Sequence, residues 1–490
     1  MRRLSLNTLG EVPKSSRPDL DPSQLTTGVV HLGIGGFHRA HQAVHTADAM
    51  TATGDTRWAI SAVTQRSPRV RDQLQPQDGL YALALRDGTD TRVRVVPSVR
   101  EILDGPSEAE EVLNRIADPA VRVVTLTVTE KAYRLHPATQ RLDTGDSEIR
   151  ADAAGRPPGT VVGRIAAGLR RRRGTDAGPL AVISCDNLAD NGALLRQAVT
   201  DYCGLLPDGE ALVEWIEEQV TFPCTMVDRI VPATTEANRT EVTSTLGLRD
   251  EATVLAEPFS QWFVQDDFRG PRPAWERAGA RLVPDVRPYE LTKLRTLNAC
   301  HSLLAYLGGL AGIDTIAEAV EIDDLAGAAR RLAESEVRPT LPPAEGIDHH
   351  DYVETTLHRF ANPALRHTTS QVASDGSRKI GPRLLGTVTD SLGQSNAPEM
   401  ATLVVAAWLR QVLVQRTDDG LALEVNDPAA PTMLQATEGR TDVASLRPAL
   451  AAAGIPDALL EDSRFTGRVE GWYAELDRAG VRATVRTAVR

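Results

Sequence analysis

A lysine, an asparagine and a histidine share one short apolar stretch in the second half of the chain. An α-helix turns by about 100° per residue, so Lys293, Asn298 and His301 would fall within an arc of roughly 140° that also holds Leu297 and Leu304. A polar group on an apolar face must find a partner or shift its protonation. Lys293 is therefore a candidate general base, and an amide beside it could stabilise an alkoxide. The same spacing also fits a half-exposed helix with an extended lysine and a hydrogen-bonded histidine.

A glycine-rich turn in the first half is typical of dinucleotide binding. Residues 27–32 predict a buried strand, and glycines directly after a strand let the backbone approach a pyrophosphate. His38 stands where the usual Gly-x-Gly-x-x-Gly pattern has its third glycine, so an ordinary glycine turn is the alternative. The candidate cofactor-binding residues of this turn are Gly33, Ile34, Gly35, Gly36 and Phe37.

Three further predicted strands end in polar residues. The strand at 58–63 normally ends in an acid that binds the ribose of NAD, but Arg66 lies here instead. Arg66 either meets the 2′-phosphate of NADP or is solvated. The strands at 121–128 and 180–187 end near Glu130 and Asn187, and open parallel sheets bind ligands at such ends. Asn187 and Asp186 could instead cap the following helix.

The length of the chain and the positions of its prolines predict two domains. At 490 residues the chain is too long for one ordinary core. Prolines between 283 and 289 place the boundary after residue 285. We predict an α/β, Rossmann-like parallel-sheet domain over 1–285 and a mostly α-helical domain over 286–490. Candidate helices of the second domain cover 316–336, 351–361, 399–416 and 469–489.

Composition restricts the partners and the compartment. A net charge of −12 disfavours nucleic acid and anionic membranes, and no apolar run approaches the roughly 18 residues of a membrane span. Four scattered cysteines fit a reducing cytoplasm and offer no zinc framework, so we expect no metal. The basic run 170–173 predicts a solvated surface patch. We expect a cytoplasmic protein, a monomer or small homo-oligomer, that binds a small molecule.

The run Lys-x-Arg-x-Leu-Asn-x-x-His-Ser at 293–302 resembles the catalytic signature of the mannitol dehydrogenase family, the polyol-specific long-chain dehydrogenases. The runs at 33–41, 184–188 and 222–232 match that family too, so the resemblance covers most of the chain. It implies oxidation of a secondary alcohol of a sugar alcohol by a nicotinamide cofactor without a metal. It also implies that Asp228 and Lys379 reach the substrate and that Val227 reaches the nicotinamide.

The resemblance implies a mechanism in a cleft between the two domains. Lys293 takes the proton of a substrate hydroxyl while a hydride leaves the same carbon for NAD, with NADP still open. Asn187 and Asn298 donate hydrogen bonds to the oxyanion, and His301 orients a neighbouring hydroxyl. Glu290, one turn before the lysine, could pass the proton to solvent. In reverse, protonated Lys293 reduces a ketose, so the expected pair is a polyol and a ketose of the mannitol and fructose type.

Two alternatives concern the substrate and one the class of protein. Arg383, together with Gln371, looks more like the family's hexuronate reductases, and an arginine fork suits the carboxylate of a keto-uronate such as fructuronate or tagaturonate. A solvated basic loop would also explain Arg383. A phosphorylated polyol, as in mannitol-1-phosphate 5-dehydrogenase, is less favoured because no second arginine cluster is present. From a different class, the chain could be an inactive dinucleotide-binding sensor.

Overall fold

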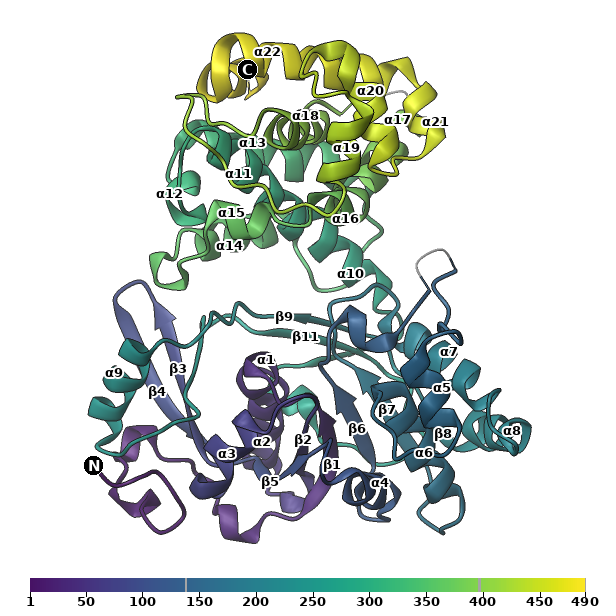
Figure 1. The fold of residues 1–490 in the computed structure, drawn as a ribbon. Coiled ribbons are helices and arrows are strands. Elements are labelled where there is room, and N and C mark those ends of the chain that lie inside the picture. The colour runs from purple at the N-terminus through teal and green to yellow at the C-terminus, as the bar shows by residue number, and fades with distance from the viewer. Residues whose placement is uncertain (137–138, 395–397, 490) are drawn as a thin grey trace. The chain divides into compact units, whose positions relative to one another are not determined.

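Six apolar runs of the first half pair into one sheet (Figure 1). Their order is β5-β2-β1-β6-β7-β8, and every neighbouring pair is parallel, which confirms the predicted Rossmann-like sheet. The expected strands at 121–128 and 180–187 are shorter than predicted because their last residues leave the sheet as loops of its carboxyl edge. The strands are β1 (Thr27–Leu32), β2 (Ala59–Thr64), β5 (Val99–Asp104), β6 (Val123–Leu126), β7 (Leu180–Ser184) and β8 (Val220–Thr221).

Helices cover both faces of this sheet. Successive strand residues point to opposite faces, so Val29 and Val123 join one buried cluster while Val30 and Val124 join another. The first cluster includes side chains of α2 (Gln42–Thr53), and the second includes side chains of α4 (Ala109–Ala117), α6 (Val161–Arg173) and α7 (Asn191–Cys203). The other helices of this half are α1 (Gly36–Ala40), α3 (Arg69–Leu74), α5 (Ser147–Ala153), α8 (Gly209–Gln219) and α9 (Glu236–Leu246).

Two small sheets accompany the large one. The first has the order β10-β3-β4 and the second β12-β11-β9, with β9 antiparallel to β11. Trp262 and Phe263 of β11 are fully buried. The strands are β3 (Tyr81–Asp87), β4 (Asp90–Val96), β9 (Thr225–Asp228), β10 (Val254–Ala256), β11 (Gln261–Gln265) and β12 (Arg281–Val283).

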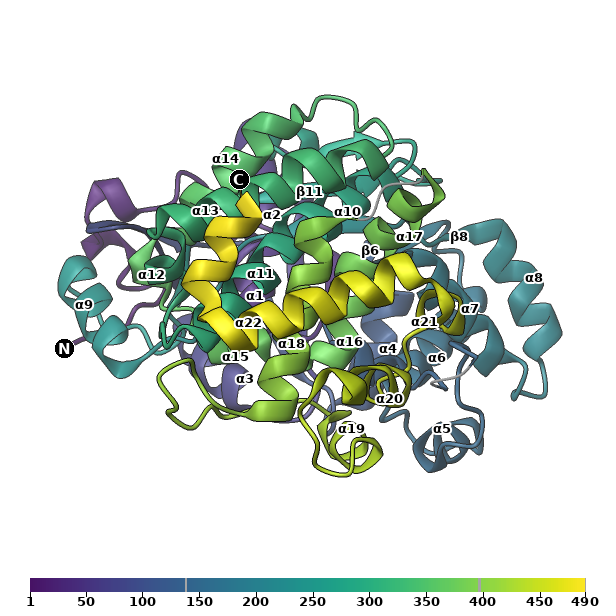
Figure 2. The same cartoon turned by 90° about the horizontal axis from the view of Figure 1, so that it is seen from above.

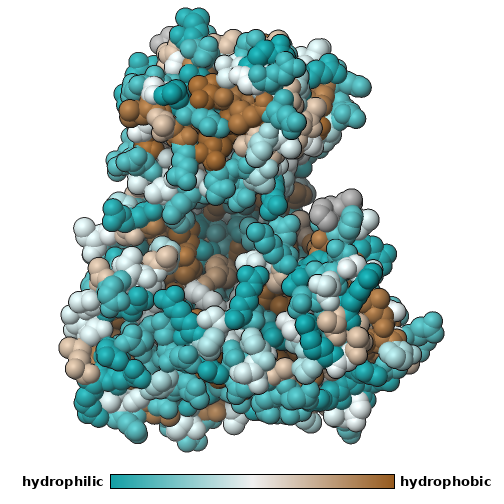
Figure 3. Space-filling view, viewed as in Figure 1, coloured by the Kyte–Doolittle hydropathy of each residue, from teal (hydrophilic) through white to brown (hydrophobic). Residues whose placement is uncertain are grey.

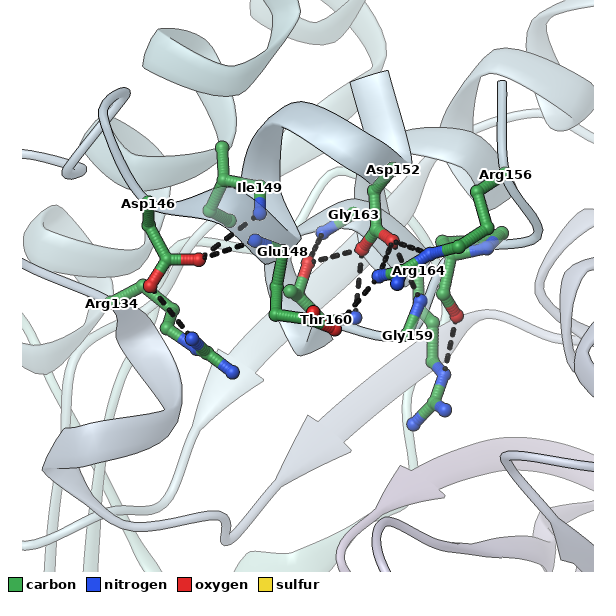
Figure 4. A network of polar contacts seen from close by, with 11 residues as sticks. Arg134, Asp146, Glu148, Ile149, Asp152, Arg156, Gly159, Thr160, Gly163 and Arg164 are labelled. Carbon is green, nitrogen blue, oxygen red and sulfur yellow. Dashed lines mark hydrogen bonds and ion pairs between the residues drawn. The ribbon is translucent and has the colours of Figure 1, made fainter. Parts of the chain in front are cut away.

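A polar network joins α5 and α6 (Figure 4). An arginine of α6 also anchors the loop after β2. The carboxylate of Asp152 accepts hydrogen bonds from the backbone of Gly159 and Thr160 and from Arg156. Beside it, Arg164 donates to the carbonyl of Pro158 at 3.0 Å and to Gln65 Oε1 at 2.6 Å. Because Gln65 directly follows β2, a buried arginine of α6 fixes this part of the carboxyl edge.

The basic run at the end of α6 is not entirely a solvated patch, contrary to the sequence prediction. Arg172 is 0% exposed and donates to the backbone carbonyls of four residues. On a helix only some positions of a continuous run face solvent, and the periodicity turns Arg172 inward. The four acceptors are Ile116, Asp118, Ala177 and Gly178.

The computed structural model describes residues 1–136, 139–394 and 398–489, and it divides into two units, Met1–Arg287 and Pro288–Arg490. The second unit is helical, and one buried cluster runs through it. Figure 2 shows α22 lying across α18, with which it is in contact. Its helices are α10 (Arg287–Thr292), α11 (Asn298–Leu310), α12 (Ile316–Val320), α13 (Asp323–Arg331), α14 (His349–Phe360), α15 (Thr369–Ala373), α16 (Gly376–Ile380), α17 (Gly386–Gly393), α18 (Glu399–Val414), α19 (Ala430–Ala436), α20 (Leu446–Ala452), α21 (Asp457–Glu461) and α22 (Ser463–Val489).

Some expected helices are interrupted. The one predicted at 316–336 consists of α12, α13 and the π-helical segment η9 (Leu332–Val337), and α22 is broken at Gly480, whose φ is 73°. Two more π-helical segments, η8 (Lys293–Leu297) and η12 (Gly381–Leu385), are in contact with each other, and η8 also contacts η9. Apolar periodicity did not reveal these segments, because Leu297, Leu332 and Leu384 remain buried within them.

Within the described ranges, no helix is both long enough and apolar enough to cross a bilayer. The face drawn in Figure 3 is largely hydrophilic, with apolar side chains gathered in smaller patches.

Candidate functional site

The first glycine of the turn after β1 is required by the fold. Gly33 has a φ of +100°, and a Cβ there would lie 2.2 Å from the carbonyl oxygen of Thr127, which follows β6. Gly35 and Gly36 are different, because a Cβ would meet nothing closer than 3.8 Å and 3.6 Å, respectively. The backbone at Gly35 and Gly36 therefore lies open after β1, which pairs with β2 on one side and β6 on the other. The strand order reverses at this point, and doubly wound sheets bind dinucleotides there.

We expect opposite effects from alanine at two of these glycines. Gly33→Ala should destabilise the fold by at least about 1–3 kcal/mol, because the new Cβ meets backbone at a disfavoured φ. Gly35→Ala should leave the melting temperature unchanged but weaken cofactor binding, because it adds bulk only on the open side. Thermal melts and cofactor titration of both variants test this. A stable Gly33→Ala variant would contradict the steric argument.

The other turn residues are divided between core and surface. Ile34 is buried in the same cluster as Cys185 and Val227, so the turn, the residue after β7 and β9 contribute to one hydrophobic core. A Cβ on Gly36 would lie 3.6 Å from Val231 Cγ1, so the segment after β9 runs beside the turn. Phe37 is part-buried and stacks on His41 with 5.0 Å between ring centroids.

His38, in the place of the third glycine, is a core residue. It is 0% exposed and stacks on His31 with 3.3 Å between ring centroids. His31 in turn contacts Thr125 Oγ1 at 2.7 Å and Thr127 Oγ1 at 3.0 Å. Burial lowers the pKa of His31 to about 3 and that of His38 well below its usual value, so both rings are neutral. Ring packing between β1 and α1 thus replaces the close approach that a third glycine allows.

The predicted polar residues of the parallel sheet lie at one edge. Arg66, Glu130 and Asn187 follow β2, β6 and β7, which are parallel strands on either side of β1, and all three are exposed. Glu130 comes after Thr129, whose φ of 73° is unusual for a residue with a side chain. The structure therefore brings these residues to the edge that carries the glycine turn.

Asp186 holds the loop after β6 in place, a role that the sequence did not reveal. Its side chain does not cap the next helix, which corrects that alternative. Instead one oxygen accepts from the backbone N–H groups of Val128 and Thr129, both at 2.8 Å, and the other accepts from the hydroxyl of Tyr133 at 2.8 Å. These bonds hold the strained loop after β6. Burial raises the pKa of Asp186 even though these donors favour the carboxylate.

The Val-Asp-Arg run lies at the end of β9. Val227 and Asp228 are 4% and 6% exposed. Arg229 donates to the carbonyl oxygens of Ala40 and Glu257 at 2.6–3.0 Å, so it ties the end of β9 to α1 and to the loop after β10. The assignments of Val227 to nicotinamide and Asp228 to substrate stay predictions.

In the helical unit, Lys293 and Asn298 are related by a π turn. The backbone N–H of Asn298 donates to the carbonyl of Lys293, five residues earlier, which is the π-helical pattern. An uninterrupted α-helix was expected here. The wider turn brings the two side chains closer in angle than α-helical spacing would, and π turns are frequent at functional sites. Both residues are 8% exposed, and Glu290 precedes them on α10.

His301 follows on α11 with a ring nitrogen in need of a partner. Its ring stacks on Phe360 at 4.6 Å and on His367 at 5.7 Å between centroids. Its Nε2 is buried, and none of the described residues hydrogen-bonds to it. Burial, followed by the nearby His367, Arg383 and Lys379, lowers the pKa of His301 well below its usual value. A neutral imidazole with one open nitrogen suits a ligand hydroxyl.

Arg383 and Lys379 reach the same region from another segment. Arg383 lies in η12, and its Nη1 donates to Ser302 Oγ at 2.9 Å and to the carbonyl of Asn298 at 3.4 Å. Lys379 Nζ donates to the carbonyl of Val372 at 3.2 Å. Burial is the main cause that lowers the pKa of both groups. Arg383 therefore lies against the helix of Asn298 and His301 and is not a solvated loop residue.

Comparison with known proteins places these features in a family. Residues 27–277 match the family model of the mannitol dehydrogenase Rossmann domain, and residues 285–476 match that of the mannitol dehydrogenase C-terminal domain. D-mannonate oxidoreductase of Escherichia coli is 38% identical over 96% of this chain and 97% of its own.

Two solved structures agree with this match. The ternary complex of Pseudomonas fluorescens mannitol 2-dehydrogenase with NAD and D-mannitol has a TM-score of 0.86 at 34% identity and covers 99% of both chains. A substrate-free D-sorbitol dehydrogenase has a TM-score of 0.90 at 30% identity and covers 99% of this chain and 100% of its own. The resemblance seen in the sequence is thereby confirmed, and the chain belongs to the mannitol dehydrogenase family, whose members are oxidoreductases acting on polyols and sugar acids.

Proposed function

We propose that this chain is an NAD(H)-dependent oxidoreductase that interconverts a secondary alcohol of a sugar acid with the corresponding keto acid. The observation that carries the substrate class is Arg383. Its guanidinium is part-buried, and its hydrogen bonds go to a hydroxyl and a carbonyl. Among the described residues no carboxylate pairs with it. A buried charge normally has a counter-ion, so a substrate carboxylate is the partner that this site lacks.

The cofactor assignment rests on the edge of the parallel sheet. Gly35 and Gly36 would leave room for the pyrophosphate, and Ile34, Phe37 and Val227 would line the rest of the site. A structural neighbour in the family holds NAD. Bound NAD would accept the hydride. Arg66 is exposed where an acid usually selects NAD, so NADP is the cofactor to compare with it.

The residues of the helical unit supply the acid–base chemistry of the proposal. Neutral Lys293 removes the hydroxyl proton, and the amide of Asn298 stabilises the developing alkoxide. The open Nε2 of His301 binds a neighbouring hydroxyl, and Glu290 exchanges the proton of Lys293 with solvent. Asn187, from the parallel-sheet unit, is assigned to the same oxyanion by the family resemblance.

A polyol and its ketose are the second candidate pair. This reading is favoured by the likeness to mannitol 2-dehydrogenase over nearly the whole chain. The roles of Lys293, Asn298 and His301 would be the same for both substrates, because they act on the reacting carbon and its neighbour. Only the group recognised by Arg383 would differ.

A substrate panel tests the proposal directly. Fructuronate, tagaturonate, fructose, mannitol, arabinitol and sorbitol would each be assayed with both cofactors. We expect the highest kcat/KM for a keto-uronate with NADH. Turnover of mannitol without turnover of either uronate would favour the polyol–ketose pair as the substrates. If no substrate is turned over, the proposal that the chain is an active oxidoreductase is contradicted.

We expect activity to survive exhaustive chelation. Among the described residues, no group of three or more His, Cys, Asp or Glu side chains could hold a metal ion. The proposed base and oxyanion donors need no Lewis acid. Activity would be measured after dialysis against a strong chelator, with metal content determined in parallel. Loss of activity that added zinc restores would contradict the proposed mechanism.

A further inference from the structure

A buried carboxylate holds the start of the helix that carries Lys379. Asp427 lies in the loop before α19 and is 7% exposed. One of its oxygens accepts from the backbone N–H of Ser377 at 2.8 Å and from Trp408 Nε1 at 3.0 Å. The other accepts from Ser377 Oγ at 2.5 Å and from the N–H of Ala429 at 3.0 Å. Asp427 thus links α16 to α18 and to its own loop.

Two further contacts seat the same point of α16. The backbone N–H of Asp375 donates to the carbonyl of Asn426 at 2.8 Å. A Cβ on Gly376 would lie 2.4 Å from Trp408 Nε1 and 2.7 Å from the hydroxyl oxygen of Tyr306, so only glycine fits against these two aromatic rings. The start of α16 is therefore fixed against α11 and α18.

The fixed point determines where the cationic groups lie. Lys379 is two residues beyond Ser377 on α16, and Arg383 follows in η12, which continues α16 directly. A helical segment is rigid over one or two turns, so a displacement at its start also displaces the residues that follow. A shift at Ser377 would therefore move both cations, and it would break the bond from Arg383 to Ser302.

We propose that Asp427 is a positioning residue that sets the preference for a negatively charged substrate by fixing residues 376–385, here termed the basic segment. The proposal rests on the proposed function for the identity of that substrate. It differs from a purely structural role because Lys379 and Arg383 of the basic segment bind a charged substrate more strongly than a neutral one. Loosening the segment should therefore lower binding of charged substrates selectively.

The test variant is Asp427→Asn. Asparagine has the same size as aspartate, but its NH₂ group replaces one of the two accepting oxygens. That NH₂ group would face N–H or O–H donors and could not accept their hydrogen bonds. We expect the KM for fructuronate to rise about tenfold, with kcat and the KM for fructose changed less than about threefold, and with NADH affinity unchanged. Hydrogen exchange of the basic segment should become faster. Ser377→Ala, which removes one of the four bonds, should act in the same direction but less, and the two changes should not be additive.

Asp442→Asn is the matched control, because Asp442 caps a short helix elsewhere in the unit by accepting from the N–H of Ser445. It should alter neither KM nor exchange in the basic segment. Equal KM changes for charged and neutral substrates in Asp427→Asn, or unchanged exchange, would overturn the proposal. If the unmodified enzyme turns over no uronate, the proposed function and the specificity role fail together, while the exchange measurement still decides whether Asp427 holds the segment.

Discussion

Lys293→Ala is expected to lower turnover by at least about 100-fold, the usual scale for loss of a general base. Lys293 is 8% exposed at the start of the π turn that carries Asn298. Without its amine, no group at that position can take the hydroxyl proton. Steady-state rates at pH 7, with cofactor affinity measured separately, test this expectation.

Two controls separate chemistry from folding. Lys293→Met keeps the bulk of the side chain and should be as inactive as the alanine variant. A small primary amine added to Lys293→Ala should restore part of the turnover, because it can occupy the space of the missing amine. Near-normal turnover of either variant would show that Lys293 is not the base.

Arg383→Ala is expected to lower kcat/KM for fructuronate by about 10- to 150-fold. A guanidinium–carboxylate pair shielded from solvent contributes about 1.5–3 kcal/mol, and each 1.4 kcal/mol is tenfold. The same variant should lose only a few-fold on fructose or mannitol, because a neutral hydroxyl lacks the charge term. Both substrates are assayed on one preparation, so general damage to the fold cancels.

Arg378 provides the matched control for Arg383. It lies in the same basic segment and is exposed, so Arg378→Ala makes the same change in charge and should alter neither substrate's kcat/KM appreciably. Arg383→Lys keeps the charge but loses the planar fork, and we expect an intermediate loss on fructuronate. Equal losses on charged and neutral substrates in Arg383→Ala would show that Arg383 supports Ser302 and α11 only.

The sequence predicted best what depends on simple periodicity. Buried strands at 27–32 and 58–63, followed by glycines or polar residues, were sufficient to predict a parallel sheet whose carboxyl edge carries the glycine turn. The sequence could not reveal that Arg172 points inward, because four successive arginines look alike until the helix register is known. His38 likewise gave no sign that it would stack on His31.

The roles expected for Asp228, Lys379 and Val227 came from the family resemblance alone. Residues that act through hydrogen bonds between distant segments lacked any local pattern. Asp186 binds the backbone at 128–129, and Asp427 binds Ser377, fifty residues away in the chain. Such pairs follow from the packing of helices and loops, which no window of sequence contains.

The π turn at Lys293 has a consequence for comparing this chain with other proteins. In an α-helix, two neighbouring side chains on one face are three or four residues apart. Here Lys293 and Asn298 are five apart, and the extra residue is absorbed by the hydrogen bond between their backbones. A search for lysine–amide pairs that assumes α-helical spacing would miss this arrangement.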